Sequence, residues 1–401
     1  MVLLLVVEGL VAEVVDDVEE DVVALVDGGS PPPEHAAKAT PPRVSEAPRR
    51  HAAYGRLVTL APLRTAPRPR PNASESTQTG PFRDFAVHRQ RTLVTMASPT
   101  LPSGTAVVLD GGLSNALVAR GHDVSGRLWT ARLLREAPDE VAAVHRAYFA
   151  AGARVATTAS YQASVEGFVA TGTTRTEAEA LIRSSVVLAR EVRDEACDDE
   201  RGGDGVERWV AASVGPYGAV LADGSEYRGR YGVGSKALRD FHRPRLELLA
   251  SASPDFFAVE TIPDVDEARV LVELLDEAGV PAWISFSCKG LLTGAGQPLS
   301  EAFEVAAAGR TVFAVGVNCC APSDVLPALE VARNVTTLPT VAYPNGGRDW
   351  DARTHRWSGR AAFDPAEAPT WVEAGAAWVG GCCQVGPSDI AHLAAAVGTT
   401  A

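Results

Sequence analysis

The sequence predicts a (β/α)8 barrel that follows an N-terminal extension of different composition. From Thr105 onward, short apolar runs alternate regularly with helical patterns. The runs are rich in β-branched residues and continuously apolar, which is typical of strands buried on both faces of a parallel sheet. No Gly-x-Gly-x-x-Gly motif follows the first run. A closed barrel is therefore favoured over an open dinucleotide-binding sheet.

Residues 1–95 differ from the rest of the chain. The first 27 residues hold eight acids and no Lys or Arg, whereas residues 28–95 hold eleven Lys and Arg, four acids and eleven prolines. Neither part keeps a sustained period, apart from a marginal acidic helix at 11–26. We interpret 1–95 as a low-complexity extension that is disordered, or that precedes the true start at Met96. Residues 96–401 form the predicted barrel domain.

The eight strands are the buried-looking apolar runs. We expect them at residues 106–110, 154–159, 209–214, 256–260, 282–287, 312–318, 336–343 and 377–381.

Start and stop signals define helices between these strands. In the helix expected at 265–278, Asp264 can cap the first turn, and a Gly follows the last residue. In the one at 365–374, Asp364 can cap and a proline occupies the first helical position. A third is expected at 138–150.

Composition and charge argue against several classes of protein. The formal net charge of −13 over 401 residues argues against a nucleic-acid partner. No apolar run approaches the roughly 20 residues of a membrane span. Residues 2–7 are apolar, but no basic residue precedes them and acids follow, unlike a signal peptide. Four of the six cysteines form two adjacent pairs, a poor pattern for disulfides. We expect a cytoplasmic protein.

Polar residues suited to chemistry follow the predicted strands, where barrel active sites lie. Asp110 ends the first strand, and Glu260 with Thr261 ends the fourth. Tyr161 and Tyr217 follow the second and third. The alternatives are a turn cap for the aspartate, a structural ion pair for the glutamate, and rim packing for the tyrosines.

The two adjacent cysteine pairs also lie at strand ends. Cys319-Cys320 and Cys382-Cys383 each follow an apolar run, and a Pro-Ser-Asp helix start comes soon after each. Three or four thiols therefore converge on one rim, which indicates a soft metal ion, zinc by default. Inert buried thiols and a closed four-cysteine structural zinc are the alternatives.

Three cysteine ligands leave one tetrahedral position of a zinc ion open, as in catalytic sites. A substrate thiol entering that position loses its proton. Three anionic sulfurs keep this thiolate electron-rich, and helix N-termini favour the anionic sulfurs. The pattern predicts attack by a metal-held substrate sulfur on an electrophilic carbon.

The remaining reactive side chains receive structural interpretations. We expect Cys197 and Cys288 to be structural or surface thiols. His145 and His242 fall in helical patterns, where we expect them to be exposed or to cap.

Two motifs carry a resemblance to a known family. Gly-Val-Asn-Cys (316–319) and Gly-Gly-Cys-Cys (380–383) resemble the zinc signature of the homocysteine S-methyltransferase family, whose members are (β/α)8 barrels that methylate homocysteine to methionine. The loop at 213–229 is similar to the branch that uses S-methylmethionine, with S-adenosylmethionine as a second donor. The resemblance spans residues 98–397 and includes segments 128–134, 158–163, 241–245, 260–261 and 343–346.

The resemblance implies roles by position. It makes Cys319, Cys382 and Cys383 the zinc ligands and leaves Cys320 out, because members vary there. It implies that Glu260 binds the ammonium of homocysteine. The other implied substrate residues are Asp110, Gly111, Tyr161, Thr261 and Asn318, and the donor-side candidates are Trp129, Tyr217 and Tyr227.

The predicted function is zinc-dependent methyl transfer from S-methylmethionine or S-adenosylmethionine to the thiol of L-homocysteine. A sulfonium leaves as a neutral thioether, so alignment suffices and no separate general base is needed. One alternative is betaine as donor, which calls for an aromatic cage in a chain with only 6% aromatic residues. Another is a non-catalytic barrel that binds zinc and homocysteine. An aldolase would favour His and carboxylate ligands. We expect a monomer or small homo-oligomer without a nucleic-acid or membrane partner.

Overall fold

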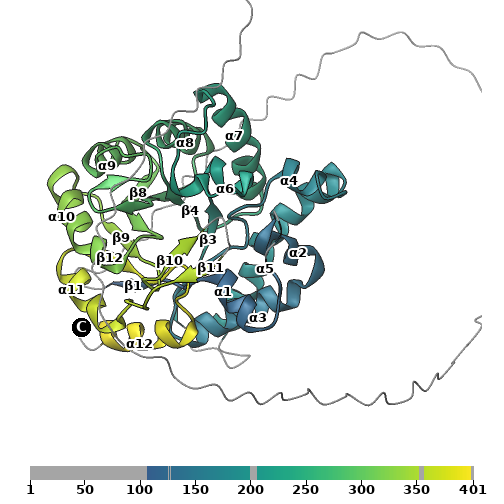
Figure 1. The fold of residues 1–401 in the computed structure, drawn as a ribbon. Coiled ribbons are helices and arrows are strands. Elements are labelled where there is room, and N and C mark those ends of the chain that lie inside the picture. The colour runs from purple at the N-terminus through teal and green to yellow at the C-terminus, as the bar shows by residue number, and fades with distance from the viewer. Residues whose placement is uncertain (1–105, 125, 127, 199–205, 352–355, 399–401) are drawn as a thin grey trace, which may run out of the picture. The chain divides into compact units, whose positions relative to one another are not determined.

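The computed structural model describes residues 106–124, 126, 128–198, 206–351 and 356–398, and these form a closed parallel β-barrel inside a ring of helices (Figure 1). Its eight-stranded sheet has the order β1-β12-β9-β8-β5-β4-β3-β2. The barrel closes through a parallel bridge between Leu109, just after β1, and Val155 of β2. The predicted fold class is confirmed.

Each predicted apolar run overlaps one barrel strand, although β4 continues to Ile262 and β12 begins at Ala376, beyond the predicted bounds. The barrel strands are β1 (Val107–Val108), β2 (Val155–Thr157), β3 (Trp209–Val214), β4 (Phe256–Ile262), β5 (Ala282–Phe286), β8 (Val312–Asn318), β9 (Thr340–Tyr343) and β12 (Ala376–Val379). Two short antiparallel hairpins lie outside the barrel: β6 (Cys288–Lys289) with β7 (Leu292–Thr293), and β10 (Asp349–Asp351) with β11 (Arg356–Ser358).

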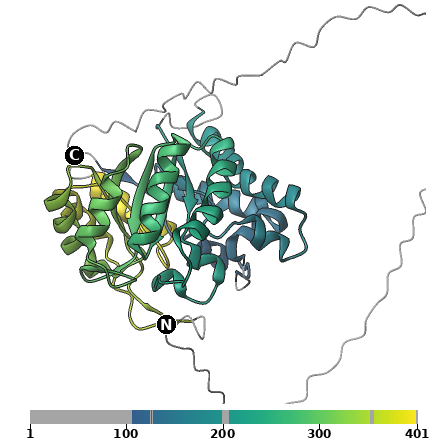
Figure 2. The ribbon, with the colours of Figure 1, turned by 90° about the horizontal axis from the view of Figure 1, so that it is seen from above.

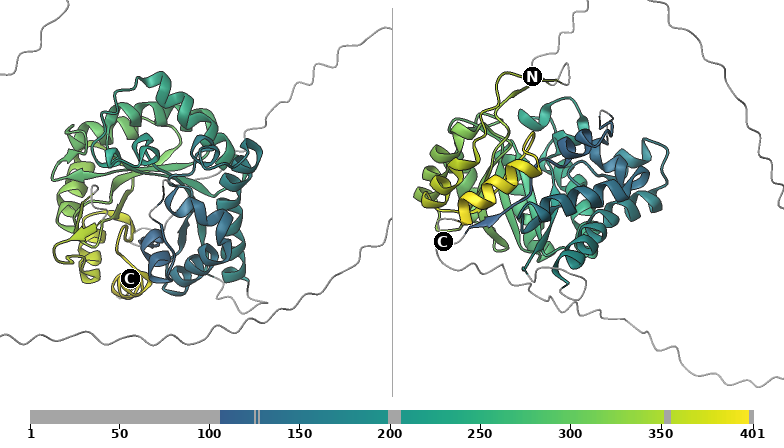
Figure 3. Two further views of the ribbon diagram at one scale, coloured as in Figure 1. Left: turned by 45° about the vertical axis from the view of Figure 1, so that its right-hand side comes forward. Right: turned by 90° about the horizontal axis from the view of Figure 1, so that it is seen from below.

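The helices surround the strands, as Figure 2 and Figure 3 show from other directions. The α-helices are α1 (Leu113–Ala119), α2 (Leu133–Glu136), α3 (Pro138–Ala150), α4 (Val165–Val169), α5 (Arg175–Cys197), α6 (Tyr217–Leu221), α7 (Ser235–Ser251), α8 (Val265–Ala278), α9 (Leu299–Ala307), α10 (Val325–Val335), α11 (Ala368–Glu373) and α12 (Pro387–Gly398). Short 3-10 helices are η1 (Trp129–Arg132), η3 (Ser225–Tyr227), η4 (Pro322–Asp324) and η5 (Pro365–Glu367).

The predicted helix signals act as expected. The Asp264 side chain accepts a hydrogen bond from the Asp266 backbone N–H at the start of α8, and Gly279 ends the helix in the left-handed conformation (φ 68°). Asp364 accepts a hydrogen bond from the Ala366 N–H in the same way. Because both ends are specified locally, α8 has the predicted bounds.

The barrel interior has its own apolar core, separate from the layer between strands and helices. Four large aromatic side chains dominate it: Phe256, Trp283, Phe313 and Trp378. Their ring centroids lie 5.3 to 6.4 Å apart in tilted or edge-on arrangements. We call this group the aromatic plug. It fills the barrel below the polar strand ends.

Both histidine predictions are wrong. His145 on α3 and His242 on α7 are fully buried. Burial without a hydrogen-bond partner for either ring nitrogen lowers the pKa of His145 to about 4, so its ring is neutral at pH 7. His242 Nε2 lies 2.8 Å from Oε1 of the fully buried Glu267. Helical periodicity could not reveal this partner, which is on another helix.

Among the described residues, no helix is long and apolar enough to cross a membrane. The predicted extension at 1–95 and its acidic helix at 11–26 lie outside the described part of the chain.

Candidate active site

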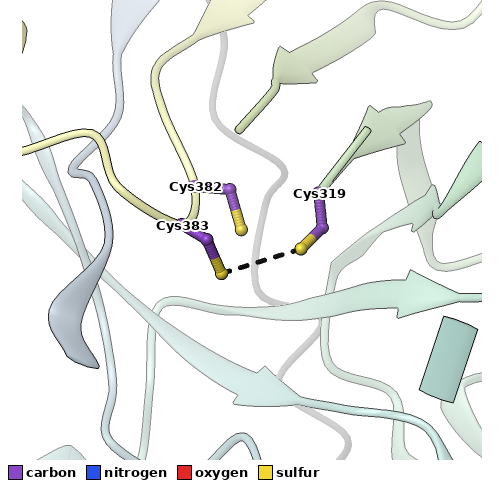
Figure 4. A group of neighbouring side chains, drawn as sticks. All are labelled: Cys319, Cys382 and Cys383. Carbon is purple, nitrogen blue, oxygen red and sulfur yellow. Dashed lines mark hydrogen bonds between the residues drawn. The ribbon is translucent and has the colours of Figure 1, made fainter. Parts of the chain in front are cut away.

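Three thiols meet where two strands end. Cys319 follows β8, and Cys382 and Cys383 follow β12. Their sulfur atoms all lie within 4.8 Å of one another, and the Cys319 and Cys383 sulfurs are 3.8 Å apart (Figure 4). The convergence predicted from the sequence is present.

A closely packed glycine precedes the cysteine or cysteines at each strand end. At Gly316 on β8, a Cβ atom would lie 1.8 Å from the Val341 carbonyl oxygen, so no other residue fits. At Gly381, a Cβ would lie 2.2 Å from the Val385 side chain. Cys319 itself has a φ of 52°, a conformation uncommon for a residue other than glycine. The glycines of both motifs therefore serve the thiol geometry.

The thiol arrangement fits a tetrahedral zinc ion. With Zn–S bonds of about 2.3 Å, tetrahedral ligand sulfurs lie about 3.8 Å apart, and the Cys319–Cys383 distance has this value. Among the described residues, no fourth His, Cys, Asp or Glu joins the group. Cys320 is buried, and the neighbouring Cys288 thiol raises its pKa well above the usual range. Three soft ligands thus leave a fourth position for an exogenous ligand.

Hydrogen bonds among the three thiols shift their pKa values in opposite directions. Hydrogen bonds with Cys382 and Cys383 lower the pKa of Cys319 well below its usual range. The same contacts with Cys319 raise the pKa of Cys382 and Cys383. Cys319 is therefore the thiol that loses its proton most readily, and a divalent cation held by the three cysteines would favour the thiolate form of all three.

Side chains that are not metal ligands also contact the ligand sulfurs. The Tyr227 hydroxyl lies 3.5 Å from the Cys319 sulfur. Nδ2 of Asn318 donates toward the Cys382 sulfur at 3.9 Å. Such contacts orient metal ligands.

A cavity of about 110 Å³ opens beside the thiols. It brings together ten of the predicted residues: Asp110, Gly111, Trp129, Tyr161, Tyr227, Glu260, Thr261, Cys319, Cys382 and Cys383.

The two predicted carboxylates of the cavity differ in their partners. Glu260 Oε1 accepts a short hydrogen bond from the Ser213 hydroxyl, and burial raises the pKa of Glu260 to about 7. Asp110 accepts hydrogen bonds from the Thr157 N–H (2.7 Å) and hydroxyl (2.8 Å). Burial nevertheless raises the pKa of Asp110 to about 8. Burial thus raises the pKa of both carboxylates, and a bound cation would favour the ionised form of either.

Asn318 does not line the cavity; its amide orients Thr261 instead. Asn318 Oδ1 accepts from the Thr261 N–H (2.7 Å), and its Nδ2 donates to the Thr261 hydroxyl (2.8 Å). Thr261 has a φ of 61°, an outlier for a β-branched residue. The paired hydrogen bonds hold this strained conformation at the cavity wall.

Tyr217 does not reach the cavity either. Its ring packs against Tyr231 and Phe241, with centroids 5.4 and 5.0 Å away. Its backbone N–H donates to the buried Glu267 at 2.6 Å.

Glu226 lines the cavity and was not singled out by the sequence analysis. It lies within the donor-like loop at 213–229, directly before Tyr227. Its position next to Tyr227 could have indicated from the sequence that Glu226 lies near the cavity. Ser213 and Gln162 are further lining residues found only by the structure.

These features define a barrel metalloenzyme with a three-thiolate centre and a carboxylate-lined cavity. The chain belongs to the homocysteine S-methyltransferase family, whose model matches residues 107–397. The enzyme class is therefore homocysteine S-methyltransferase, and the family predicted from the cysteine motifs is confirmed.

The alignments with individual relatives cover nearly the whole length of each relative. "Homocysteine S-methyltransferase YbgG" of Bacillus subtilis is 42% identical over 294 residues, covering 72% of this chain and 93% of the relative. A homocysteine S-methyltransferase of Escherichia coli is 41% identical over 295 residues, covering 72% and 94%. The crystal structure of the homocysteine methyltransferase MmuM from Escherichia coli, in its metallated form, matches with a TM-score of 0.64 and 40% identity, covering 72% of this chain and 96% of that one.

Proposed function

We propose that this enzyme transfers a methyl group from S-methylmethionine to the thiol of L-homocysteine, giving methionine, with S-adenosylmethionine as a second donor. The observation that carries the proposal is the meeting of three metal-ligand thiols with the buried carboxylate of Glu260 in one cavity. An amino acid that bears a thiol needs both features. The relatives named above are homocysteine methyltransferases by name.

Zinc bound by the three cysteines supplies a fourth position that stabilises the deprotonated form of a substrate thiol. The chain's own residues then align the reactants. Glu260 accepts the homocysteine ammonium, and the backbone beside Gly111 and Asp110 receives its carboxylate. Trp129, Tyr161 and Tyr227 line the cavity and exclude water from the reacting sulfurs.

The methyl transfer needs no general base. The proton of the homocysteine thiol leaves to solvent when the thiolate forms. The thiolate electron pair forms the new C–S bond, while the electrons of the donor's C–S bond stay on its sulfur. That sulfur leaves as a neutral thioether.

We further propose that residues 96–401 contain everything required for this reaction. The thiols require a reducing environment, which supports a cytoplasmic location.

A donor panel tests the proposal. Zinc-loaded protein is incubated with homocysteine and either S-methylmethionine, S-adenosylmethionine or betaine, and methionine is quantified. We expect the fastest turnover with S-methylmethionine, and loss of turnover after the metal is removed by chelation. Turnover only with betaine would overturn the donor assignment. Binding of homocysteine without turnover on any donor would identify a non-catalytic barrel.

A further inference from the structure

The cavity contains a second buried glutamate that the roles above leave unused. Glu226, in η3, is 5% exposed and lines the same cavity as the three thiols. Its Oε2 atom has no hydrogen-bond partner in the described part of the structure. A buried, unpartnered carboxylate oxygen costs stability, so its presence points to a ligand that completes its contacts.

The loop around Glu226 is held in place, so the carboxylate is preorganised. The Ser225 N–H donates to Asp223 Oδ1 at 2.9 Å, immediately before Glu226. Immediately after it, the Tyr227 hydroxyl lies 3.5 Å from the Cys319 sulfur. Both neighbours are thereby fixed, one to the loop and the other to the metal centre.

Among the described residues, no cationic side chain forms an ion pair with this carboxylate, although Arg228 attracts it at longer range. Arg228 is the cation of the same loop, but its Nη1 donates to the Asp223 carbonyl oxygen at 3.3 Å and its Nη2 lies 4.0 Å from Asp223 Oδ2. The Arg228 side chain is 62% exposed. Burial, with a smaller contribution from the charge of Cys319, raises the pKa of Glu226 to about 7. A cation bound in the cavity would favour the ionised form.

The charges of the substrates identify which cation this is. Homocysteine brings one ammonium, for which Glu260 is already proposed. A sulfonium amino acid brings an ammonium and a sulfonium, with a net charge of one positive unit. Betaine and methionine are both net neutral. Of the three carboxylates that line the cavity, Asp110 is hydrogen-bonded to Thr157 and Glu260 is assigned to homocysteine. Glu226 therefore remains for the positive charge of a sulfonium donor.

We propose that Glu226 is the residue that selects the positively charged methyl donor, through an ion pair between its carboxylate and the donor's sulfonium. This inference rests on the proposed function. The donor loses its net charge when the methyl group leaves, so the ion pair favours the donor over the neutral thioether product. Glu226 thereby provides discrimination between S-methylmethionine and methionine, which differ by one methyl group and one charge.

The test is steady-state kinetics of the full-length zinc-loaded enzyme carrying Glu226→Gln. The amide keeps the shape of the side chain and removes the charge. We expect the KM for S-methylmethionine to rise about tenfold to a hundredfold, with the KM for homocysteine changed less than about twofold. Inhibition by methionine should stay unchanged. Glu247→Gln makes the same chemical change at an exposed position of α7 and serves as the control.

Glu226→Asp separates the loss of charge from a loss of folding, because it keeps the charge on a shorter side chain. We expect its donor KM to lie between those of the wild type and Glu226→Gln. A rise in homocysteine KM, or an unchanged donor KM in an active Glu226→Gln enzyme, would overturn the inference and leave the proposed function intact. If the wild type forms no methionine with any donor, the proposed function itself fails.

Discussion

The two ends of the barrel interior are built from the same strands and have opposite character. On β4, alternate residues face inward, and these are Phe256, Ala258 and then Glu260. On β12 and the residues after it, the sequence runs from Trp378 through Gly380 to Cys382. The aromatic plug fills the amino-terminal part, whereas the carboxyl-terminal rim carries carboxylates and thiols.

Three residues of the rim have strained backbone conformations. Trp129, Thr261 and Cys319 line the cavity, and all three have positive φ values (42°, 61° and 52°). Phe256, Trp283, Phe313 and Trp378 of the plug are not among the positive-φ residues. The comparison teaches that the plug contributes stability, and that this stability offsets the strain and buried charge at the rim.

The largest effect is expected from a substitution that disrupts the metal site at the rim and leaves the plug unchanged. Cys382→Ser removes one of three metal ligands, so methionine formation should fall more than about a hundredfold, because losing a ligand exceeds the 10–100-fold effect of losing a residue that orients one. Metal content should fall with it. Circular dichroism should remain that of the wild type. A fully active Cys382→Ser enzyme would contradict the metal assignment.

The next largest effect is expected from a substitution in the aromatic plug that leaves the rim unchanged. Phe256→Ala removes a fully buried ring that contacts three other aromatic side chains, and should lower the free energy of unfolding by about 3 to 5 kcal/mol. Urea denaturation measures it. Zinc content and homocysteine KM should stay near wild type in the folded fraction. A loss of metal binding without a loss of stability would show that the two regions are not separable.

A smaller effect is expected from substituting a residue that supports the metal ligands without being one of them. Asn318→Ala removes the side chain that holds Thr261 and contacts the Cys382 sulfur. Zinc affinity should fall about 10–100-fold, as measured by competition with a chelating dye. Ser285→Ala is the matched control, because the Ser285 hydroxyl donates to Asn318 Oδ1 (2.8 Å) and contacts no ligand sulfur in the described structure. Equal zinc affinity in both variants would assign Asn318 a purely structural role.

The sequence was sufficient for the features that depend on local pattern. Continuous apolar runs predicted every barrel strand, and Asp264 with Gly279 defined both ends of α8. The thiols were also predictable, because their motifs follow β8 and β12, and parallel strands of a barrel end at one rim.

The features that the sequence did not supply depend on long-range contacts. His242 is paired with Glu267, a residue 25 positions away on another helix. Tyr217 ends a strand-end motif as a cavity residue would, yet its ring packs on Phe241 of α7. Glu226 enters the cavity because a loop folds over the strand ends. Periodicity carries no information on such tertiary placement.

The smallest expected effect concerns the charge of Glu260. Burial raises the pKa of Glu260 to about 7 in the free protein, so its ionised fraction falls about tenfold for each pH unit well below this value. Only the ionised form pairs with the homocysteine ammonium. The kcat/KM for homocysteine, which reports groups of the free enzyme, should therefore fall as the pH drops from 8 to 6. Saturating donor keeps Glu226 occupied during this measurement.

Homocysteine's own thiol also titrates, so the wild type must be compared with Glu260→Gln at each pH. The ratio of their kcat/KM values cancels the thiol's contribution, because both enzymes use the same substrate. We expect this ratio to be largest above pH 7 and to decline by up to about tenfold by pH 6. A ratio that does not change with pH would mean that Glu260 stays in one protonation state between pH 6 and pH 8, and would contradict the titration expected from its buried position.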